Sequence, residues 1–203
     1  TDSHLPEYIT MLIERLQPMG IRGIFLDILI TGNPEKEQWM DLIQATKNAQ
    51  NIYYPVIPAN QAYISTINTY DGGNLYQLYR VQKQGAIPKT NWLVFPFYEL
   101  SIAARGLGHI RHIPGLDGIT RKLPLLYSYR GKYIPALSFR MVCDYLNVQE
   151  NNIEIIPGKH ILLKNATYPS SGVVRDITIP IDEMGRMTIN FSGLNPDRFP
   201  NFN

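Results

Sequence analysis

The residues with the greatest capacity for chemistry gather in one stretch, 108–125, which reads GHIRHIPGLDGITRKLPL. It contains His109, His112 and Asp117, residue types that ligate metals or transfer protons. The β-branched neighbours of the histidines indicate a strand, on which side chains three positions apart point to opposite faces. No cysteine or glutamate accompanies them, so we expect no metal site. Asp117 and Gly118 instead favour the tight turn of a β-hairpin.

A second candidate for chemistry is Asp27, which lies near the end of the apolar run 21–30. A carboxylate there, with a threonine four residues later, resembles the D-x-D-x-T nucleophile loop of phosphatase-type hydrolases. Leu29 stands where that loop has its second aspartate, so the general acid is missing. A soluble α/β hydrolase of degenerate phosphatase type that uses Asp27 remains the alternative function. The structural alternative is an ion pair of Asp27 with Arg22 or Arg121.

No other catalytic or cofactor motif stands out in the sequence. Gly106 and Gly108 resemble the start of a dinucleotide fingerprint, but Arg111 replaces the third glycine, and a strand is expected where a helix must begin. There is no G-x-S-x-G elbow, P-loop or H-E-x-x-H motif. The single cysteine, Cys143, lies in a helical pattern and is expected to be a buried, inert thiol. We therefore expect no catalytic residues and no cofactor.

The composition indicates an ordinary globular protein. The chain has 203 residues, of which 44% are hydrophobic and 18% charged, with a net charge of +2. This length suits one large domain with its own core. The basic residues are scattered along the sequence, which argues against a nucleic-acid partner. No apolar run reaches the ~20 residues that span a bilayer.

The elements that must position these residues alternate between helix and strand at first. Apolar residues at helical spacing predict a helix that stops at Pro18 and Gly20. The continuous apolar run 21–30 predicts a strand covered on both faces. Asn33 favours the start of a second helix, and 51–58 predicts a second strand. This β-α-β order is typical of α/β proteins.

Two features follow the second strand. Pro55 within it favours an edge strand or a bulge. Residues 59–97 are rich in tyrosine and asparagine and show no sustained period. Because disordered segments are poor in aromatic residues, we interpret 59–97 as an ordered insertion. It could contact a ligand or a second copy of the chain, or it could be a structural flap.

Regular patterns return from residue 98. The patterns predict a short helix, a hairpin formed by 108–130, and a helix from Ile134 to Tyr145 with Pro135 near its start. Four short strands then follow, separated by turns. The chain is therefore expected to be a single α/β domain, a mixed β-sheet flanked by helices, with the Tyr/Asn-rich insertion.

Three separated pieces of the sequence resemble the CHASE2 family of bacterial sensor domains. The first is ERLQPMGIRGIFLDILI, the second GLGHIRHIPGLDGITRKLPLLYSYRGKYIPALSFRMV, and the third IPIDEMGRMTINFSG. The family has a hairpin of the form D-x-D-G-x-x-R-x-x-P-L and an ending of the form I-P-x-D-x-x-G-R-x-x-I-N. The motif positions that match, with structural roles implied, are Gly108, His109, Asp117, Gly118, Pro124, Asp182, Gly185 and Arg186.

The resemblance covers most of 5–193, with two departures. The family's opening strand, which precedes the first helix, has no counterpart here, and 59–97 follows no family pattern. The resemblance implies a sensor domain on the extracytoplasmic face of the bacterial membrane. Transmembrane helices outside residues 1–203 would anchor the parent protein, which would carry an adenylate/guanylate cyclase or a protein kinase. The stimulus would be an unknown small molecule or protein, and a homodimer is possible.

The binding residues follow from the expected position of the insertion. If a pocket lies at the strand ends that carry Asp27 and Arg121, the insertion would cover it. We expect its tyrosines to contribute, namely Tyr70, Tyr76 and Tyr79. An internal ion pair of Asp27 and Arg121 is the structural alternative, because buried charges are usually paired.

Overall fold

The computed structural model describes residues 4–31, 37–59 and 86–191. Its centre is a four-stranded sheet in which β1 and β5 pair in parallel with β2, while β4 pairs with β2 in antiparallel orientation. These strands are β1 (Ile24–Phe25), β2 (Ile52–Ala59), β4 (Trp92–Val94) and β5 (Gly106–His109). The expected α/β domain with a mixed sheet is confirmed.

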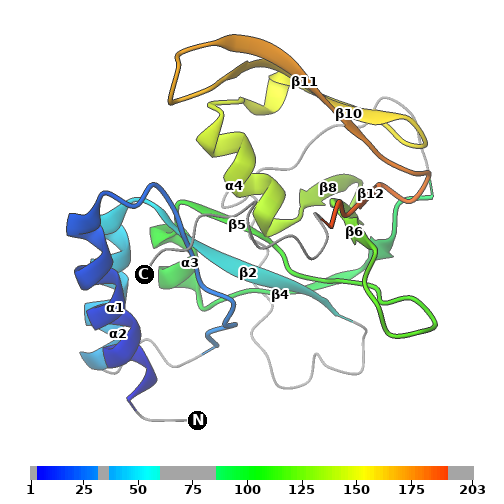
Figure 1. The fold of residues 1–203 in the computed structure, drawn as a ribbon. Helices are drawn as coiled ribbons and strands as arrows, with labels where there is room; N and C mark the ends of the chain where they lie inside the picture. Colours follow the sequence, from blue (N-terminus) through cyan, green and yellow to red (C-terminus); the bar gives the residue numbers. More distant parts are fainter. Residues whose placement is uncertain (1–3, 32–36, 60–85, 192–203) are drawn as a thin grey trace.

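Three helices pack together with this sheet and form the first core. They are α1 (Leu5–Leu16), α2 (Glu37–Ala49) and α3 (Tyr98–Ala103). In α1 the helical spacing places Ile9 and Ile13 on the buried face. The helix passes into a 3-10 turn, η1 (Gln17–Met19), and stops at Gly20, whose φ of 71° suits glycine. Figure 1 shows α1 and α2 side by side at one end of the molecule.

A second core lies under an antiparallel sheet formed by the later part of the chain. Its strands are β9 (Ile153–Ile156), which follows the 3-10 turn η3 (Glu150–Asn152), β10 (His160–Thr167) and β11 (Val174–Pro180). The helix α4 (Leu137–Tyr145) buries Phe139 and Cys143 in this core, against residues such as Ile161 and Leu163. Cys143 is therefore a buried helical residue, as predicted.

Two smaller sheets connect these cores. One pairs β6 (Lys122–Pro124) with β12 (Arg186–Thr188), and the other has the order β3 (Lys89–Thr90), β7 (Leu126–Tyr129) and β8 (Lys132–Pro135). The described residues therefore form four sheets, where the sequence predicted one. β7 and β8 form a tight hairpin, in which Arg130 and Gly131 both have positive φ.

α4 lies between the central sheet and the antiparallel sheet, as Figure 1 shows. On its sheet-facing side the helix approaches β5 so closely that a Cβ on Gly108 would lie 2.6 Å from Leu137 Cα. Side chains four residues apart lie on the same face of a helix, so Arg140 and Asp144 share one side of α4. Phe139 and Cys143 lie on the other side, in the second core. One short helix thus packs against the central sheet on one side and into the second core on the other.

The expectation of a long strand over 21–30, covered on both faces, is wrong. β1 is only two residues long, and Phe25 and Asp27 are exposed while Leu26 is buried. The reason lies in β2. Leu26 N–H donates to Tyr53 O, so the next bond of this parallel ladder would need the N–H of Pro55, which proline lacks. Pro55 therefore ends the pairing of β1 with β2.

Pro55 itself lies in the central strand, so its expected place at an edge is also wrong. It is registered with Gly108 on one side, through β5. On the side toward which its nitrogen points, the β1 ladder ends at Tyr53, and no described strand residue is registered against it. A residue without an N–H is therefore tolerated in this central strand, because its nitrogen faces no paired strand among the described residues.

The hairpin expected over 108–130 does not form, because its two arms enter different sheets. β5 pairs with β2, whereas β6 pairs with β12. Pro135 does not begin a helix but ends the strand β8, and α4 starts two residues later. Residues 86–97 belong to the body, not to an insertion, because they form β3 and β4 and bury Phe95 in the first core.

Candidate functional site

The most promising cavity lies where the parallel strands begin. It has a volume of about 640 Å³, within the range of ligand pockets. Its floor is formed by residues at the start of β1, β2 and β5 or just before these strands. Its wall is formed by the C-terminal end of α4. Its lining includes Arg22, Gly23, Tyr53, Arg105, Asp144 and Tyr145.

Tyr53 lines this cavity, and its ring lies between two glycines, its registered neighbour Gly106 and Gly23 just before β1. A Cβ on Gly23 would lie 3.4 Å from the Tyr53 ring, and a Cβ on Gly106 would lie 3.2 Å from it. Gly23 precedes β1 and Gly106 begins β5, the two strands that flank β2. The ring therefore lies between two positions without side chains, and its hydroxyl reaches α4.

That hydroxyl belongs to a polar cluster around Asp144. Tyr53 Oη donates to Asp144 Oδ2 at 2.8 Å, and Arg140 Nη1 donates to Asp144 Oδ1 at 2.6 Å. Arg105 Nε lies 3.7 Å from the same carboxylate. Burial, followed by the hydrogen bond to the Asp144 carboxylate, raises the pKa of Tyr53 to about 12. Tyr53 is therefore a neutral hydrogen-bond donor at physiological pH.

Arg22 forms the outer wall of the cavity. Its guanidinium lies 5.5 Å from the centre of the Tyr145 ring, a cation–π contact. Arg22 is exposed and makes no ion pair with any described residue. Its position is fixed by the aromatic ring rather than by a carboxylate.

A second cavity lies at the opposite ends of the parallel strands. It measures about 490 Å³ and is lined by Ile57 of β2, by residues 110–114 after β5, and by Tyr127. His109 packs edge-on against Tyr127, with ring centroids 4.8 Å apart. Its two ring nitrogens are buried and make no hydrogen bond with any described residue. Burial lowers the pKa of His109 to about 3, so the ring is neutral.

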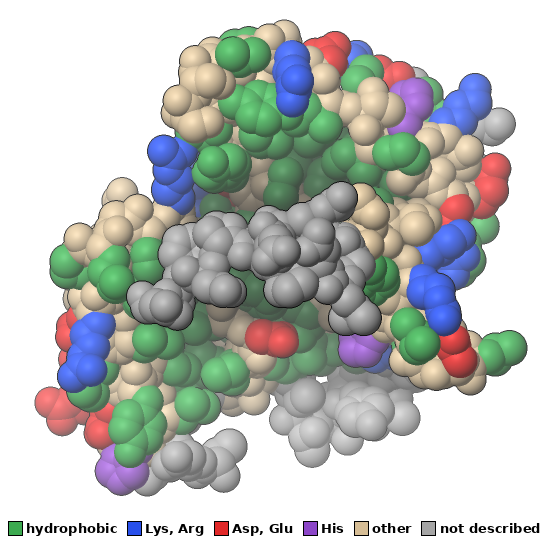
Figure 2. Space-filling model, viewed as in Figure 1, with side chains coloured by type: hydrophobic (Ala, Val, Ile, Leu, Met, Phe, Trp, Pro, Cys, Tyr) green, Lys and Arg blue, Asp and Glu red, His purple; other side chains and the backbone are tan. Residues whose placement is uncertain are grey.

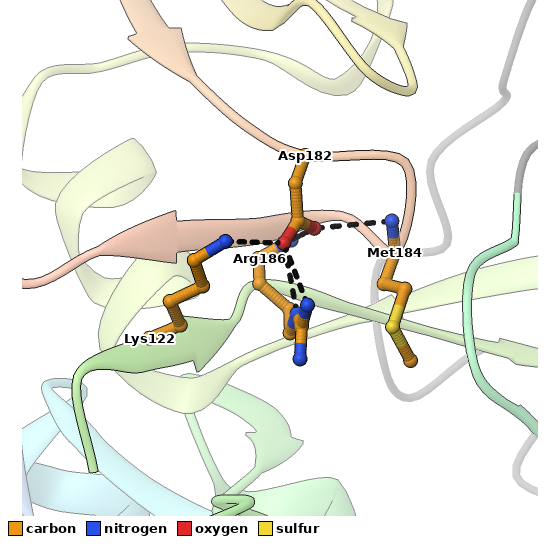
Figure 3. A network of polar contacts seen from close by, with 4 residues as sticks. All are labelled: Lys122, Asp182, Met184 and Arg186. Carbon is orange, nitrogen blue, oxygen red and sulfur yellow. Dashed lines mark hydrogen bonds and ion pairs between the residues drawn. The ribbon is translucent and has the colours of Figure 1, made fainter. Parts of the chain in front are cut away.

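The motif residues predicted from the sequence hold turns and strands together. Asp182 binds Lys122 of β6 at 3.1 Å and Arg186 of β12 at 2.9 Å, and it accepts the backbone N–H of Met184 (Figure 3). Partial burial raises the pKa of Asp182. The hydrogen bonds from Arg186 and Lys122 outweigh that effect and hold the pKa below its usual value. Gly185 has a φ of 69°, which completes the turn.

The other acidic motif residue, Asp117, stabilises the loop before β6. It accepts the N–H of Ile119 and pairs with Arg121, the closest atoms being 2.7 Å apart. The hydrogen bond from Arg121 lowers the pKa of Asp117. Gly118, with a φ of 77°, completes this turn. Both acidic motif positions thus have structural contacts.

Comparison with known proteins agrees with this arrangement. A family model of the CHASE2 domain matches residues 5–203. The chain belongs to the CHASE2 family. CHASE2 domains are extracellular sensor domains of signalling receptors and are not catalytic. No curated protein and no solved structure matches the chain.

Of the residues predicted to bind ligand, the structure of this CHASE2 domain describes Asp27 and Arg121, and these two do not pair with each other. Arg121 pairs with Asp117, so it is not the partner of Asp27. Asp27 is exposed and makes no hydrogen bond or ion pair with a described residue, so the expected strut with Arg22 or Arg121 is wrong. No described contact favours Asp27 as a nucleophile. The predicted tyrosines, Tyr70, Tyr76 and Tyr79, lie outside the described residues.

Sequence reasoning missed the residues that form the cavity at the strand starts. Two patterns could have found them. Arg140 and Asp144 stand four apart on a predicted helix, the spacing of an ion pair. Gly23 and Gly106 each stand at the start of a strand, where a glycine often allows a close approach of another group.

Two further findings concern the parts of the chain that the structure describes. None of the helices there combines the length and apolar character needed to cross a membrane. Nor does any group of three or more His, Cys, Asp or Glu side chains in these parts form a metal site. On the face shown in Figure 2, the coloured basic side chains are dispersed rather than gathered into a patch.

Proposed function

We propose that this CHASE2 domain is the extracytoplasmic input domain of a bacterial transmembrane receptor and binds its stimulus in the cavity at the strand starts. The effector inside the cell would be an adenylate/guanylate cyclase or a protein kinase. Membrane helices outside residues 1–203 would anchor the receptor, and two copies could pair. The observation that carries this proposal is the family match over 5–203.

The position of the cavity supports the proposal. Its wall is the last turn of α4, and the same helix packs into the second core. A stimulus shifts a receptor between two arrangements only by binding one of them more tightly than the other. A ligand that contacts both α4 and the strand starts would bind more tightly to the arrangement in which the distance between them matches its size. It would therefore shift the receptor toward that arrangement.

The membrane orientation can be tested by labelling the full-length receptor. Leu116 is fully exposed at the tip of a turn, whereas the native Cys143 is fully buried. We expect Leu116→Cys in intact cells to react with a membrane-impermeant maleimide. The receptor without this substitution is the control for any other cysteine of the parent protein. Labelling that occurs only after the cells are lysed would contradict the proposed location.

The role of the cavity in signalling needs a second experiment on the full-length receptor. Val142 lines the cavity, and Val173 is similarly exposed outside it, before β11. We expect Val142→Trp to change effector output, measured as cyclic nucleotide formed or protein phosphorylated in membranes, because the indole fills the cavity. Val173→Trp should signal like the unmodified receptor. Equal output from both variants would remove the cavity from the mechanism.

A further inference from the structure

The charges that line the cavity at the strand starts do not balance. Arg22, Arg105 and Arg140 supply three positive charges in or directly behind the cavity, and Asp144 supplies one negative charge. The difference is two positive charges. No other Asp, Glu, Lys or His lines this cavity among the described residues.

The innermost of these arginines already has its partner. Arg140 is 6% exposed and lies 2.6 Å from Asp144, on the same helical face. A buried arginine of this kind needs that carboxylate, because an unpaired buried charge costs several kcal/mol. Asp144 also accepts the hydroxyl of Tyr53. Asp144 therefore already has two partners that lie closer to it than Arg105 does.

Arg105 and Arg22 are the outer arginines of the cavity. Arg105 is 54% exposed, and its Nε forms only a long ion pair with Asp144, at 3.7 Å. Its guanidinium also interacts with the hydroxyl of Tyr53. Arg22 contacts the ring of Tyr145 and has no ion pair with a described residue. A guanidinium presents a planar set of donors that matches a carboxylate or a phosphate. Both groups therefore remain available to an anion inside the cavity.

The rest of the lining is apolar and aromatic. The rings of Tyr53 and Tyr145 face the cavity together with Met141 and Val142. Asn51 is already engaged, since its amide donates to Ile21 O and accepts from Gln17. The lining thus offers flat, apolar surfaces beside two cationic groups, which suits a ligand with a carbon body and charged ends.

We propose that this cavity binds a small organic dianion, a dicarboxylate or a phosphate monoester, held by Arg22 and Arg105, with its carbon body against Tyr53 and Tyr145. Two negative charges match the two unbalanced positive charges. The volume of about 640 Å³ accommodates a metabolite-sized molecule. This inference rests on the proposed function in one respect: it places the stimulus in the same cavity.

The test is isothermal titration calorimetry of the 203-residue chain with phenyl phosphate and with succinate. Phenol and succinamide are the uncharged counterparts. We expect at least one anion to bind while its counterpart does not, and we expect the affinity to fall as KCl is raised, because salt screens exposed charges. Arg22→Gln and Arg105→Gln should each weaken binding at least tenfold.

A matched control lies outside the cavity. Arg175 of β11 lies 4.5 Å from the centre of the Tyr168 ring, a cation–π contact like that of Arg22 with Tyr145, and it also donates to the Tyr168 hydroxyl. Arg175→Gln should leave the affinity unchanged. Because Arg22, Arg105 and Arg175 are all exposed, we expect the three variants to keep the circular dichroism spectrum of the unmodified chain.

Three results would overturn the inference: no heat from either anion, equal binding to the double variant Arg22→Gln/Arg105→Gln, or inorganic phosphate and phenyl phosphate binding equally well. Binding of phenol or succinamide that Val142→Trp abolishes would reject the dianion but keep the cavity as the ligand site. Labelling of Leu116→Cys only in lysed cells would reject the extracytoplasmic receptor whatever the calorimetry shows. Failure of the dianion inference and failure of the receptor proposal therefore give different experimental results.

Discussion

At the scale of single residues, two buried polar side chains, His109 of β5 and Arg140 of α4, avoid an unpaired buried charge in different ways. Arg140 keeps its charge and pairs with Asp144. His109 has no polar partner among the described residues and stays neutral against the ring of Tyr127. A neutral imidazole avoids the large cost of a buried charge, but its nitrogens lose their hydrogen bonds to water.

The first prediction concerns His109 and acid. In the folded state its pKa is about 3, and in the unfolded state about 6.5, so below pH 6.5 the unfolded chain binds the extra proton. The resulting loss of stability begins near pH 6.5 and continues as the pH falls toward 3. Between pH 6.5 and pH 5 this group should lower the free energy of unfolding by about 2 kcal/mol.

Urea unfolding of His109→Phe at several pH values measures this effect. The variant should lose less stability than the unmodified chain between pH 6.5 and pH 5. His112→Phe, at the exposed neighbouring histidine, serves as the control and should follow the unmodified chain. Parallel curves for His109→Phe and the unmodified chain would show that His109 is not the titrating group.

At the scale of elements, the contact of β5 with α4 depends on Gly108. An added Cβ would lie 2.6 Å from Leu137 Cα and 2.7 Å from Leu137 N, and backbone atoms cannot turn away as the end of a side chain can. Either the helix or the strand must move. The motif glycine is therefore required by the distance between two elements, not by its own φ.

The second prediction is that Gly108→Ala lowers the free energy of unfolding by about 3 kcal/mol, the upper range for overpacking. Gly172→Ala is the matched control. Gly172 has a φ of 68° and open space around its Cβ position, so only backbone strain of about 1 kcal/mol is expected. Urea unfolding gives both values. A loss at Gly108 no larger than at Gly172 would mean that α4 shifts freely.

The sequence could predict most elements but not their partners. Helical spacing predicted α1 and α4 with errors of a few residues, whereas the end of β8 was predicted to begin a helix. The errors arose from long-range pairing. The extent of β1 depends on Pro55 of another strand, and β6 pairs with β12, which lies about sixty residues later in the chain. Such pairings depend on tertiary structure rather than on local pattern.

The candidate site was predictable to a smaller extent, for the same reason. The motif residues Asp117 and Asp182 were found because each lies in a contiguous motif of the family that it resembles, and each does accept a backbone N–H within four residues of itself. Tyr53 and Asp144 were missed because their hydrogen bond joins positions 91 residues apart. The cavity has no contiguous motif, since its lining comes from the starts of three strands and the end of one helix.

At the scale of the whole molecule, the helix α4 links the two cores, because it packs on the central sheet and belongs to the second core. The first core contains Leu100 and Ile134, the second contains Phe139 and Leu163, and α4 lies between them. Neither core can separate without exposing one face of α4. We therefore expect the domain to unfold in one cooperative transition, although its hydrophobic residues form two clusters.

The third prediction tests this coupling. Both tryptophans report on the first core, because Trp39 packs against it and Trp92 lies in β4. Leu163→Ala leaves a cavity in the second core and should cost about 3 kcal/mol. The urea midpoints measured by tryptophan fluorescence and by circular dichroism should fall together. Leu116→Ala, at a fully exposed residue, should move neither midpoint.

An unchanged fluorescence midpoint in Leu163→Ala, with a lowered midpoint by circular dichroism, would show instead that the cores unfold separately. In that case the wall and the floor of the ligand cavity could open without loss of the central sheet.

The ring of Tyr53 between Gly23 and Gly106 has an evolutionary consequence. A Cβ at position 106 would lie 3.2 Å from the ring, closer than ordinary packing allows. A Cβ at position 23 would lie in van der Waals contact with the ring, at 3.4 Å, so a larger side chain there also needs a smaller residue at position 53. A small residue at position 53, in turn, leaves a void between two glycines that nothing fills. The three positions should therefore show strong epistasis, and in related sequences they should change as a set, so that covariation among them identifies this cavity without a structure.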